Sequence, residues 1–405
     1  MRLRHLVVVA LGVLPFVAIS GQQPSRLTRE QVVTSALARG PRLRLASADT
    51  QLAAAQLLTA RGIPDPLLSA SYTKSLPRYH VTAEMPLDFL WLRGTRIQSA
   101  EAAGLAARYR FAYDRASIVL EADTTYTQAL AAQARRQLST RNAAAADSVR
   151  RIAVARRDAG DASDLDVELA TISAGQAANA AAADSLALDA ALLTLQSLVG
   201  MSTDRIEASL ADSLAEPVIV GVTVTDTTLA VASAVAALRS ATLTSSVQRR
   251  SAWGFPGITF GFETGDPTGS EPGLLPTVGI TIPLPFFNRN RGPIAEAEAA
   301  RVRAAADLAL TRVQAQVQVT RAQAAQLGAM ARVTRDRLLV TSANRAATMS
   351  LTAYREGAAP LASVLEAQRA ARDILGQYID DVAAASIAAA TLRVLTLTPS
   401  SAAQP

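Results

Sequence analysis

The stretch Thr281-Ile-Pro-Leu-Pro-Phe-Phe-Asn-Arg-Asn-Arg-Gly292 decides how this chain folds, because it repeats an earlier stretch, Glu84-Met-Pro-Leu-Asp-Phe-Leu-Trp-Leu-Arg-Gly94. In both, an apolar segment leads through proline and aromatic residues to Arg-Gly. Pro86 and Pro283 lie 283 − 86 = 197 residues apart, and the closing glycines lie 292 − 94 = 198 residues apart. A constant offset indicates an internal duplication, which decides the architecture before any single residue does.

A further pair of landmarks keeps the same offset. Arg157-Asp-Ala-Gly160 is echoed by Arg355-Glu-Gly357, and 357 − 160 is again 197. We therefore expect two copies of one unit, at about 28–200 and 227–397. Between and after them, residues 201–226 and a polar tail over 398–405 are predicted to be irregular, and either to pack around the middle of the hairpins or to stay loose.

Short strands are predicted ahead of each Arg-Gly. Apolar and polar residues alternate over about 67–87 and 257–285, which is the period-two pattern of a strand with one apolar face. In the second copy Ile258, Phe260 and Phe262 share the apolar face. Five residues are expected to mark the junctions between strand pairs and helices: Pro86, Gly94, Pro283, Pro285 and Gly292.

Very long helices follow the strands. The segments from Leu87 to Glu216 and from Ile294 to Ala359 contain no proline. Helices over about 95–158 and 293–355 would each span on the order of 90–100 Å. Each ends at a glycine break and returns, over about 162–199 and 361–397, while a single helix is predicted over 28–62. We expect a mainly α-helical, extended fold with a small β part.

Composition narrows the class of protein. Half of the 405 residues are hydrophobic, cysteine is absent, and the basic start with an apolar run predicts a signal peptide over residues 1–20. No other apolar run approaches the length of a membrane helix, so contact with a membrane must use strands. Without the leader's Arg2 and Arg4 the charge is 38 − 34 = +4, and the scattered charges argue against nucleic-acid binding.

Four strands with an apolar face cannot seal themselves in lipid, because their edge groups would stay unpaired. Two copies would give eight strands and a filled barrel, whereas three would give twelve strands and an open lumen. Aromatic residues flank the strands as in the girdles of membrane barrels, although they also suit the core of a soluble sheet: Tyr72, Tyr79, Phe89, Trp91, Trp253, Phe255, Phe286 and Phe287.

Together, the run from Val278 to Gly292, the motif Tyr354-Arg-Glu-Gly357 with its continuation Ser363-Val-Leu-Glu366, and Gly160 with Asp166 resemble TolC-like outer-membrane efflux proteins. The resemblance implies a homotrimer with a shared twelve-stranded β-barrel in outer-membrane lipid. It implies a twelve-helix tunnel continuing from that barrel into the periplasm. The implied partners are a periplasmic adaptor protein and an inner-membrane pump of the RND or ABC type, and no cofactor or catalysis is expected.

The resemblance also suggests where such a conduit closes. Candidate gate residues near the glycine breaks are Tyr354, Asp166, Glu366 and Asp164. We hypothesise that Tyr354 hydrogen-bonds Asp166, so that Tyr354→Phe would raise conductance, and that copies of Glu366 ring the lumen. The family's arginine is Ala359 here, and Arg355 could replace it. Solvated acids on a helix face are the simpler reading. The expected adaptor contacts are Gly160, Asp161, Gly357 and Ala358.

Two other classes remain open. An exported periplasmic coiled-coil scaffold without a pore explains the leader and the long helices, but it leaves the alternating strands and the duplication unexplained. An enzyme lacks support, because His80 is the only histidine outside the leader and no glycine-rich phosphate loop precedes a helix.

Overall fold

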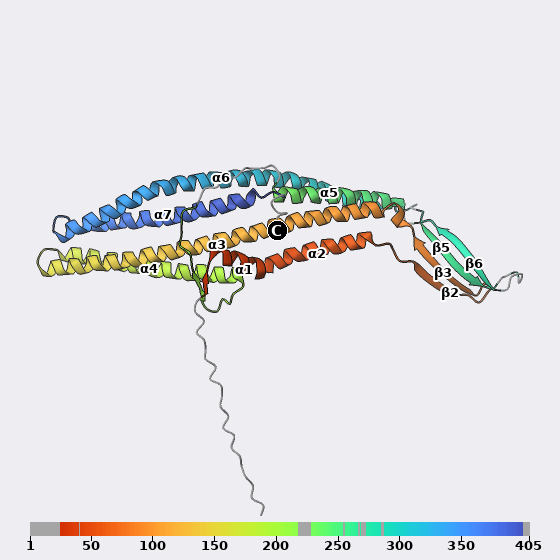
Figure 1. The fold of residues 1–405 in the computed structure, drawn as a ribbon, viewed down its shortest axis with the longest axis horizontal. Coiled ribbons are helices and arrows are strands. Elements are labelled where there is room, and N and C mark those ends of the chain that lie inside the picture. Colours follow the sequence, from red (N-terminus) through yellow and green to blue (C-terminus); the bar gives the residue numbers. More distant parts are fainter. Residues whose placement is uncertain are drawn as a thin grey trace, which may run out of the picture.

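The computed structural model describes residues 25–39, 41–217, 228–253, 256–265, 268, 273–284 and 287–399. It is an elongated ribbon of helices with a small β-sheet at one end (Figure 1). The predicted signal peptide, Pro285, Phe255 and Phe286 lie outside the described residues, as do 218–227 and 400–405.

The two copies have the same order of elements. The first holds α2 (Pro41–Arg61), strands β2 (Leu67–Tyr72) and β3 (Tyr79–Pro86), and helices α3 (Arg93–Asp158) and α4 (Asp164–Val199). The second holds α5 (Leu229–Arg250), strands β5 (Gly257–Thr264) and β6 (Leu274–Thr281), and helices α6 (Arg291–Arg355) and α7 (Leu361–Leu395). The two long helices are 66 and 65 residues long, close to the predicted ranges.

One helix prediction was wrong. The segment 28–62 is two helices, α1 (Arg29–Arg39) and α2, and the second begins at Pro41. Proline has no backbone N–H and restricts the residue before it, so it is tolerated in the first turn of a helix and interrupts a longer one. Gly40 precedes it in the sequence, so the pair was a readable break signal.

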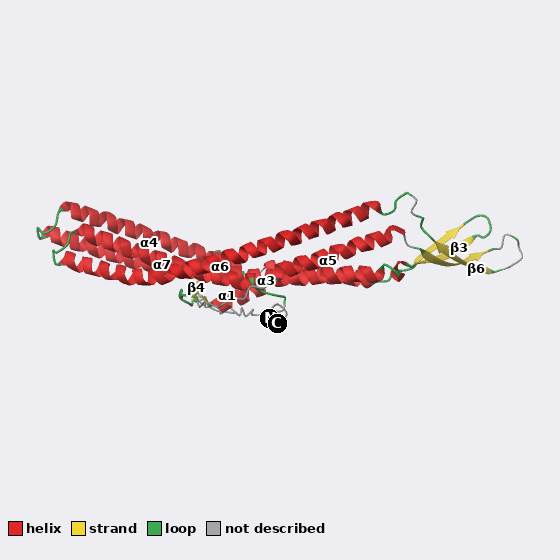
Figure 2. Cartoon of the chain, turned by 90° about the horizontal axis from the view of Figure 1, so that it is seen from above, coloured by secondary structure: helices red, strands yellow, loops and turns green. Residues whose placement is uncertain are grey.

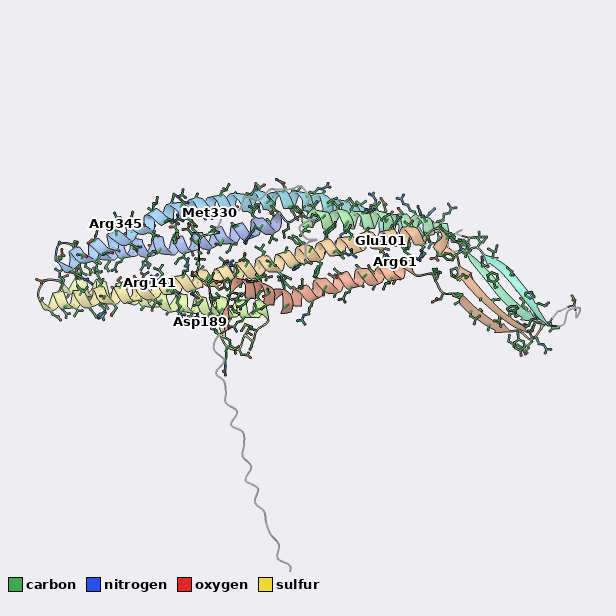
Figure 3. All side chains as sticks on the ribbon, viewed as in Figure 1. Arg61, Glu101, Arg141, Asp189, Met330 and Arg345 are labelled. Atoms are coloured by element: carbon green, nitrogen blue, oxygen red, sulfur yellow. The ribbon has the colours of Figure 1, made fainter. Side chains whose placement is uncertain are left out.

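The helices lie side by side in a fixed order. Helix α3 packs against α2 and α4 on one flank and against α5 and α7 on the other, and α6 packs against α5 and α7. Helices α2 and α4 therefore follow each other along one edge of the ribbon, and α6 runs the whole length of the other edge (Figures 1 and 2). Near the sheet Arg61 of α2 reaches Glu101 of α3, with 3.5 Å between Nη2 and Oε1 (Figure 3).

The four strands form one antiparallel sheet in the order β2-β3-β5-β6. Its register places apolar residues opposite one another, with Val81 across from Phe262 and Phe260 across from Val278. The same face carries exposed Leu68 and Ile280 at the two outer strands. The other face is polar and holds His80 next to Glu263, with 3.3 Å between Nδ1 and Oε1. The predicted alternation is confirmed.

A short segment crosses the middle of the ribbon. We call residues 208–217 the strap. It begins with β4 (Ala208–Leu210), which pairs in parallel with β1 (Ser25–Leu27). Tyr126 of α3 donates a hydrogen bond to Asp212 Oδ2 at 2.8 Å, and Tyr378 of α7 donates to Glu216 Oε1 at 2.7 Å. The strap thus joins both hairpins and packs around their middle, which is one of the two arrangements expected for residues 201–226. The β1–β4 pair was not predicted.

Helices α4 and α5 correct a second expectation. Both contain 18-residue windows of mean hydropathy 1.3 and 1.2, so by length and composition alone they qualify as candidate membrane spans. The sequence reading underestimated them because their apolar character comes largely from dispersed alanine. Both pack lengthwise against α3 within the ribbon, so the structure uses them as helices of the ribbon.

Candidate functional site: the hairpin tips and the seam between the hairpins

Each helical hairpin ends in a tight turn far from the sheet (Figure 1). We call residues 159–163 and 356–360 the tip turns. Gly160 has φ +83° and Gly357 has φ +76°, in the left-handed region that favours glycine. In the first turn the Asp161 N–H donates to Arg156 O at 2.8 Å, and in the second the Ala358 N–H donates to Ala353 O at 2.8 Å. These are two matching Schellman caps.

The proposed adaptor contacts lie at the surface of these turns. Gly160, Asp161, Gly357 and Ala358 are all exposed. Asp164 is also exposed, and its carboxylate lies 3.9 Å from Arg157 Nη1 of the same hairpin. The tip turns therefore expose mainly small side chains and few charged ones to solvent.

The Asp166 side chain helps to cap the N-terminus of α4. The Asp166 N–H donates to Ser163 Oγ at 3.2 Å, and the Ser163 N–H donates to Asp166 Oδ2 at 3.3 Å. This reciprocal pair is a capping box, which satisfies two backbone donors at the helix start. The second hairpin has Pro360 and Ser363 at the corresponding places, and there the Ser363 hydroxyl donates to Pro360 O at 2.7 Å.

The predicted hydrogen bond between Tyr354 and Asp166 is absent. Tyr354 is 2% exposed, and its hydroxyl has no hydrogen-bond partner among the residues that the structure describes. Burial raises the pKa of the Tyr354 hydroxyl above its ordinary value, and the nearby Asp166 charge acts in the same direction against the opposing effect of Arg156. The bond does not form because the capping box occupies the Asp166 side chain, while the tyrosine ring packs into the core of the tips.

Arg156 is the residue that the sequence reading missed. Its Nη1 donates to Tyr354 O at 2.7 Å, and its Nη2 donates to Asp161 O at 3.2 Å. The guanidinium also lies 4.8 Å from the centre of the Tyr354 ring, as in a cation–π contact. Arg355, which was considered as a substitute for the missing family arginine, is exposed on α6.

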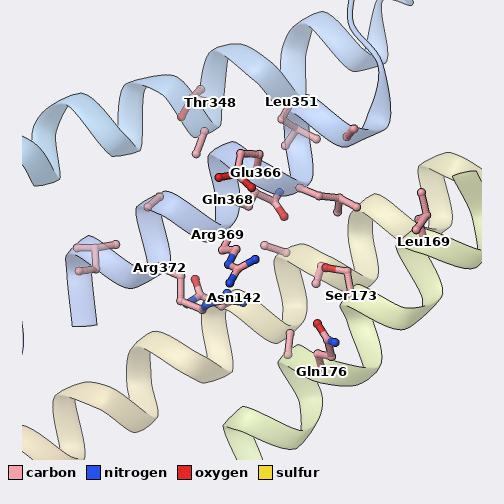
Figure 4. A pocket seen from close by; sticks show the side chains of 18 of the residues that line it. Asn142, Leu169, Ser173, Gln176, Thr348, Leu351, Glu366, Gln368, Arg369 and Arg372 are labelled. Atoms are coloured by element: carbon pink, nitrogen blue, oxygen red, sulfur yellow. The ribbon is translucent and has the colours of Figure 1, made fainter. Parts of the chain in front are cut away.

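A cavity of about 740 Å³ lies between the two hairpins on the sheet side of the tips (Figure 4). Residues from α3, α4, α6 and α7 line it, among them Asn142, Gln176 and Arg369. Glu366 is exposed and lines the same space. The structure thus brings Glu366 to the seam between the hairpins, and its predicted place in a ring around the lumen stays a prediction.

At the opposite end, the junction between sheet and helices has its own clamp. Arg93 and Arg96 at the start of α3 donate to the carbonyl oxygens of Arg61 and Gly62 at the end of α2, at 2.9 to 3.2 Å. Arg96 also pairs with Asp88, at 3.0 Å. The Arg-Gly motif therefore contributes its arginine to this contact.

The other predicted junction residues flank this contact. Pro86 ends β3, Gly94 and Gly292 lie in the first turns of α3 and α6, and Pro283 follows β6. The junction predictions therefore fall at the boundaries between strands and helices in both copies, except for Pro285, which the structure does not describe.

A carboxyl pair lies in the interface between α6 and α7 near the middle of the ribbon. Asp336 is 5% exposed and Asp381 is 7% exposed. Arg332 donates to Asp381 Oδ1 at 2.7 Å, but the Oδ2 atoms of both aspartates are buried without a hydrogen-bond partner. Burial first, and then the Asp381 carboxyl, raises the pKa of Asp336 above its ordinary value. No sequence pattern marked this pair, because the acids come from different helices.

Within the described residues no group of three or more histidine, aspartate or glutamate side chains could hold a metal ion.

A family model described as outer membrane efflux protein matches residues 228–396. This match agrees with the resemblance seen in the sequence, with the expected outer-membrane location and with the expectation of a transport protein. No curated protein matches the chain.

Solved structures of several membrane proteins match nearly the whole chain. A membrane protein from Pseudomonas aeruginosa is 21% identical, with a TM-score of 0.77 over 91% of this chain and 93% of that one. The outer membrane protein VceC from Vibrio cholerae is 17% identical, with a TM-score of 0.76 over 91% and 96%. The CmeC outer membrane channel of Campylobacter jejuni is 14% identical, with a TM-score of 0.74 over 97% and 94%. At these identities the matches show the fold.

Proposed function

We propose that this protein is the passive exit duct of a tripartite export system, formed by three copies of the chain. The observation that carries the proposal is that helices and strands have the same lateral order. The strands run β2-β3-β5-β6, and the helices that adjoin them run α2-α3-α5-α6. The chain is thus one strip of wall, with a sheet part and a helix part in register.

Both edges of this strip are unpartnered in a single copy. Among the described residues, β2 and β6 each pair on one side only. Helix α6 carries exposed apolar residues such as Leu310 and Leu338, and α4 carries exposed Leu165 and Leu186. Joining the α2–α4 edge of one copy to the α6 edge of the next closes a ring and satisfies both strand edges. Three copies give twelve strands, which leaves a lumen.

The sheet supports an orientation in lipid. Its apolar face includes Leu68, Val278 and Ile280, at 72%, 71% and 73% exposure, which suits contact with outer-membrane lipid. Tyr72 and Tyr79 contact each other at the far end of the sheet, with ring centres 5.2 Å apart and ring planes tilted by 50°. The opposite, polar face would then line the lumen.

The charges of the two edges are complementary in the half nearest the tips. Helix α4 carries five acidic residues and no basic one. Over residues 322–355, α6 carries five arginines and one aspartate. Glu168 and Asp189 on α4, and Arg345 on α6, form no ion pair within the described chain, and Figure 3 shows Asp189 and Arg345 on opposite edges. Opposite charge on facing edges favours the head-to-tail contact that a ring requires.

The tips are the proposed docking end. The exposed turns 159–163 and 356–360 would contact a periplasmic adaptor, which links the duct to an inner-membrane pump of the RND or ABC type. Gating at this end is assigned to Tyr354, Glu366 and Asp164 with the cap residue Asp166. A scaffold without a pore gives no role to the two unpaired strand edges.

The test uses the full mature protein purified in detergent. Light scattering should report three copies per particle, and insertion into a planar bilayer should give discrete conductance steps. A water-soluble monomer without conductance would support the coiled-coil scaffold and end the proposal. A trimer that never conducts would leave assembly standing and reject the duct.

A further inference from the structure

The two hairpins of one copy meet along a discontinuous seam. At the tip all four helices contribute to one apolar cluster, which includes Val149, Ala170, Tyr354 and Val364. Toward the sheet, the cavity of about 740 Å³ separates the hairpins. Contact resumes at the middle of the ribbon, where the strap joins them. The tip contact is therefore a separate attachment that depends on few residues.

Arg156 spans this attachment. It lies in the last turn of α3, and its side chain reaches the carbonyl of Tyr354 in the last turn of α6 as well as the carbonyl of Asp161 in its own tip turn. The last carbonyls of a helix carry partial negative charge, so a guanidinium between two such ends is favourable to both. One side chain thus satisfies carbonyls in both hairpins, and its charge lies over the Tyr354 ring.

The duplication makes this contact directional. With the 197-residue offset, Arg156 corresponds to Ala353 (353 − 197 = 156) and Tyr354 corresponds to Arg157 (354 − 197 = 157). Alanine at 353 cannot reach across, so the second copy of the unit has no reciprocal bond. Among the described residues the Arg156 bond is the one arginine contact between the two tips, while Arg135 of α3 pairs with Asp380 of α7 farther along the seam, and the two turns have the same backbone caps.

We infer that Arg156 is the positioning residue that fixes the two hairpin tips of one copy to each other, so that the tips separate only when Arg156 releases Tyr354. We call this contact the tip staple. Its meaning for gating rests on the proposed function, whereas the staple itself is a property of the single chain. It also replaces the role first given to the Tyr354 hydroxyl, because that hydroxyl has no partner.

The neighbouring residue provides a matched control. Arg157 has the same charge and lies one position away, but its guanidinium pairs with Asp158 at 2.6 Å and approaches Asp164, all within the first hairpin. Arg157→Ala removes a charge from the tips without touching the seam.

The experiment measures the distance between the tips directly. Because the chain has no cysteine, spin labels can be placed at Ala159→Cys and Ala358→Cys, both exposed on the tip turns. The full mature protein in detergent is diluted with unlabelled protein, so that pulsed electron spin resonance reports the distance within one copy. Arg156→Ala should move the distance distribution to longer values and broaden it, Arg156→Lys should have a smaller effect, and Arg157→Ala should match the parent.

The outcomes separate the staple from the duct. An unchanged distance in both Arg156 variants, with helix content and melting temperature retained, would overturn the staple and leave the apolar cluster as the sole tip contact. A longer distance with unchanged single-channel conductance would keep the staple and reject tip gating. A longer distance with raised conductance supports both.

Discussion

At the scale of single residues, the most consequential groups are those that lack a partner. The Oδ2 atoms of Asp336 and Asp381 are buried, and no donor reaches them. A buried carboxylate without a partner is costly, and two carboxyls near each other favour one shared proton. Arg332 donates to the other oxygen of Asp381, at 2.7 Å, whereas burial raises the pKa of the Asp336 carboxyl.

This arrangement predicts that the contribution of Asp336 to the free energy of unfolding falls as the pH rises. Since the pKa of Asp336 is raised above its ordinary value of 3.8, the folded state binds the proton more tightly than the unfolded chain. The extra stability is complete below the ordinary pKa and is lost as pH rises through the raised one. Asp336→Asn should flatten the dependence of melting temperature on pH and raise that temperature at neutral pH.

The control variant is chosen from the charged groups near Asp336. They are Arg332 and Arg335 on its own helix and Asp381 on α7, while the strap brings Glu216, which pairs with Arg337 and Tyr378. Asp380 is adjacent in sequence but exposed and paired with Arg135. Asp380→Asn should therefore keep the parent's pH slope. Equal slopes in the parent and in Asp336→Asn would contradict the shared proton.

The sequence identified the right positions at the tips but not their partners. Gly160, Gly357, Asp166 and Tyr354 lie where the duplication placed them. The partner of Tyr354 could not be read, because it depends on how α3 and α6 are rotated about their axes. Arg156 is one of several arginines near the break, and only the packed structure distinguishes it from its neighbours.

At the scale of elements, periodicity and breaks predicted the long helices and the four strands well. The proline-free stretches and the alternating residues are strong signals because they extend over many positions. Shorter features were missed: the break before Pro41, and the pair β1–β4, whose three residues per strand are too few for a pattern. The capping box at Ser163 was readable in principle from its spacing to Asp166.

Glycine substitutions should show opposite signs at tips and in helices. Gly160→Ala and Gly357→Ala put a side chain at positive φ, which costs about 1 kcal/mol each. Gly104 lies within α3 with nothing near the place of a Cβ atom, so Gly104→Ala should stabilise by about 0.5–1 kcal/mol. Denaturant unfolding in detergent measures both, and a stabilising Gly160→Ala would contradict the cap.

At the scale of the whole molecule, the single chain is elongated and leaves a large surface exposed (Figure 1). Its accessible surface is 25743 Å², terminal segments included, whereas a compact monomer of this mass exposes about 15,000 Å². The exposed apolar residues lie largely along α2, α4, α6 and the apolar face of the sheet. These are the surfaces that neighbouring copies and lipid would cover in the proposed duct.

The charged edges predict that assembly depends on salt and on the sign of the α4 residues. Glu168→Lys with Asp189→Lys should lower the fraction of oligomer, because two positive charges then face the arginines of α6. Mass photometry at low and high salt measures that fraction, and the defect should shrink at high salt as screening increases. Asp114→Lys on the central helix α3 is the control. An equal loss in that control would argue against edge pairing.

The common order of strands and helices has a consequence for what the composition can tell us. In a wall that is one helix thick, most helices pack against a neighbouring helix on each of two opposite faces and face water on the other two. Close packing on both of these faces requires small side chains. The high alanine content then follows from the thickness of the wall, and it would be the same whether the exported compound were a toxin, an antibiotic or an ion. Selection among exported compounds would then have to be made by the component that delivers them to the duct.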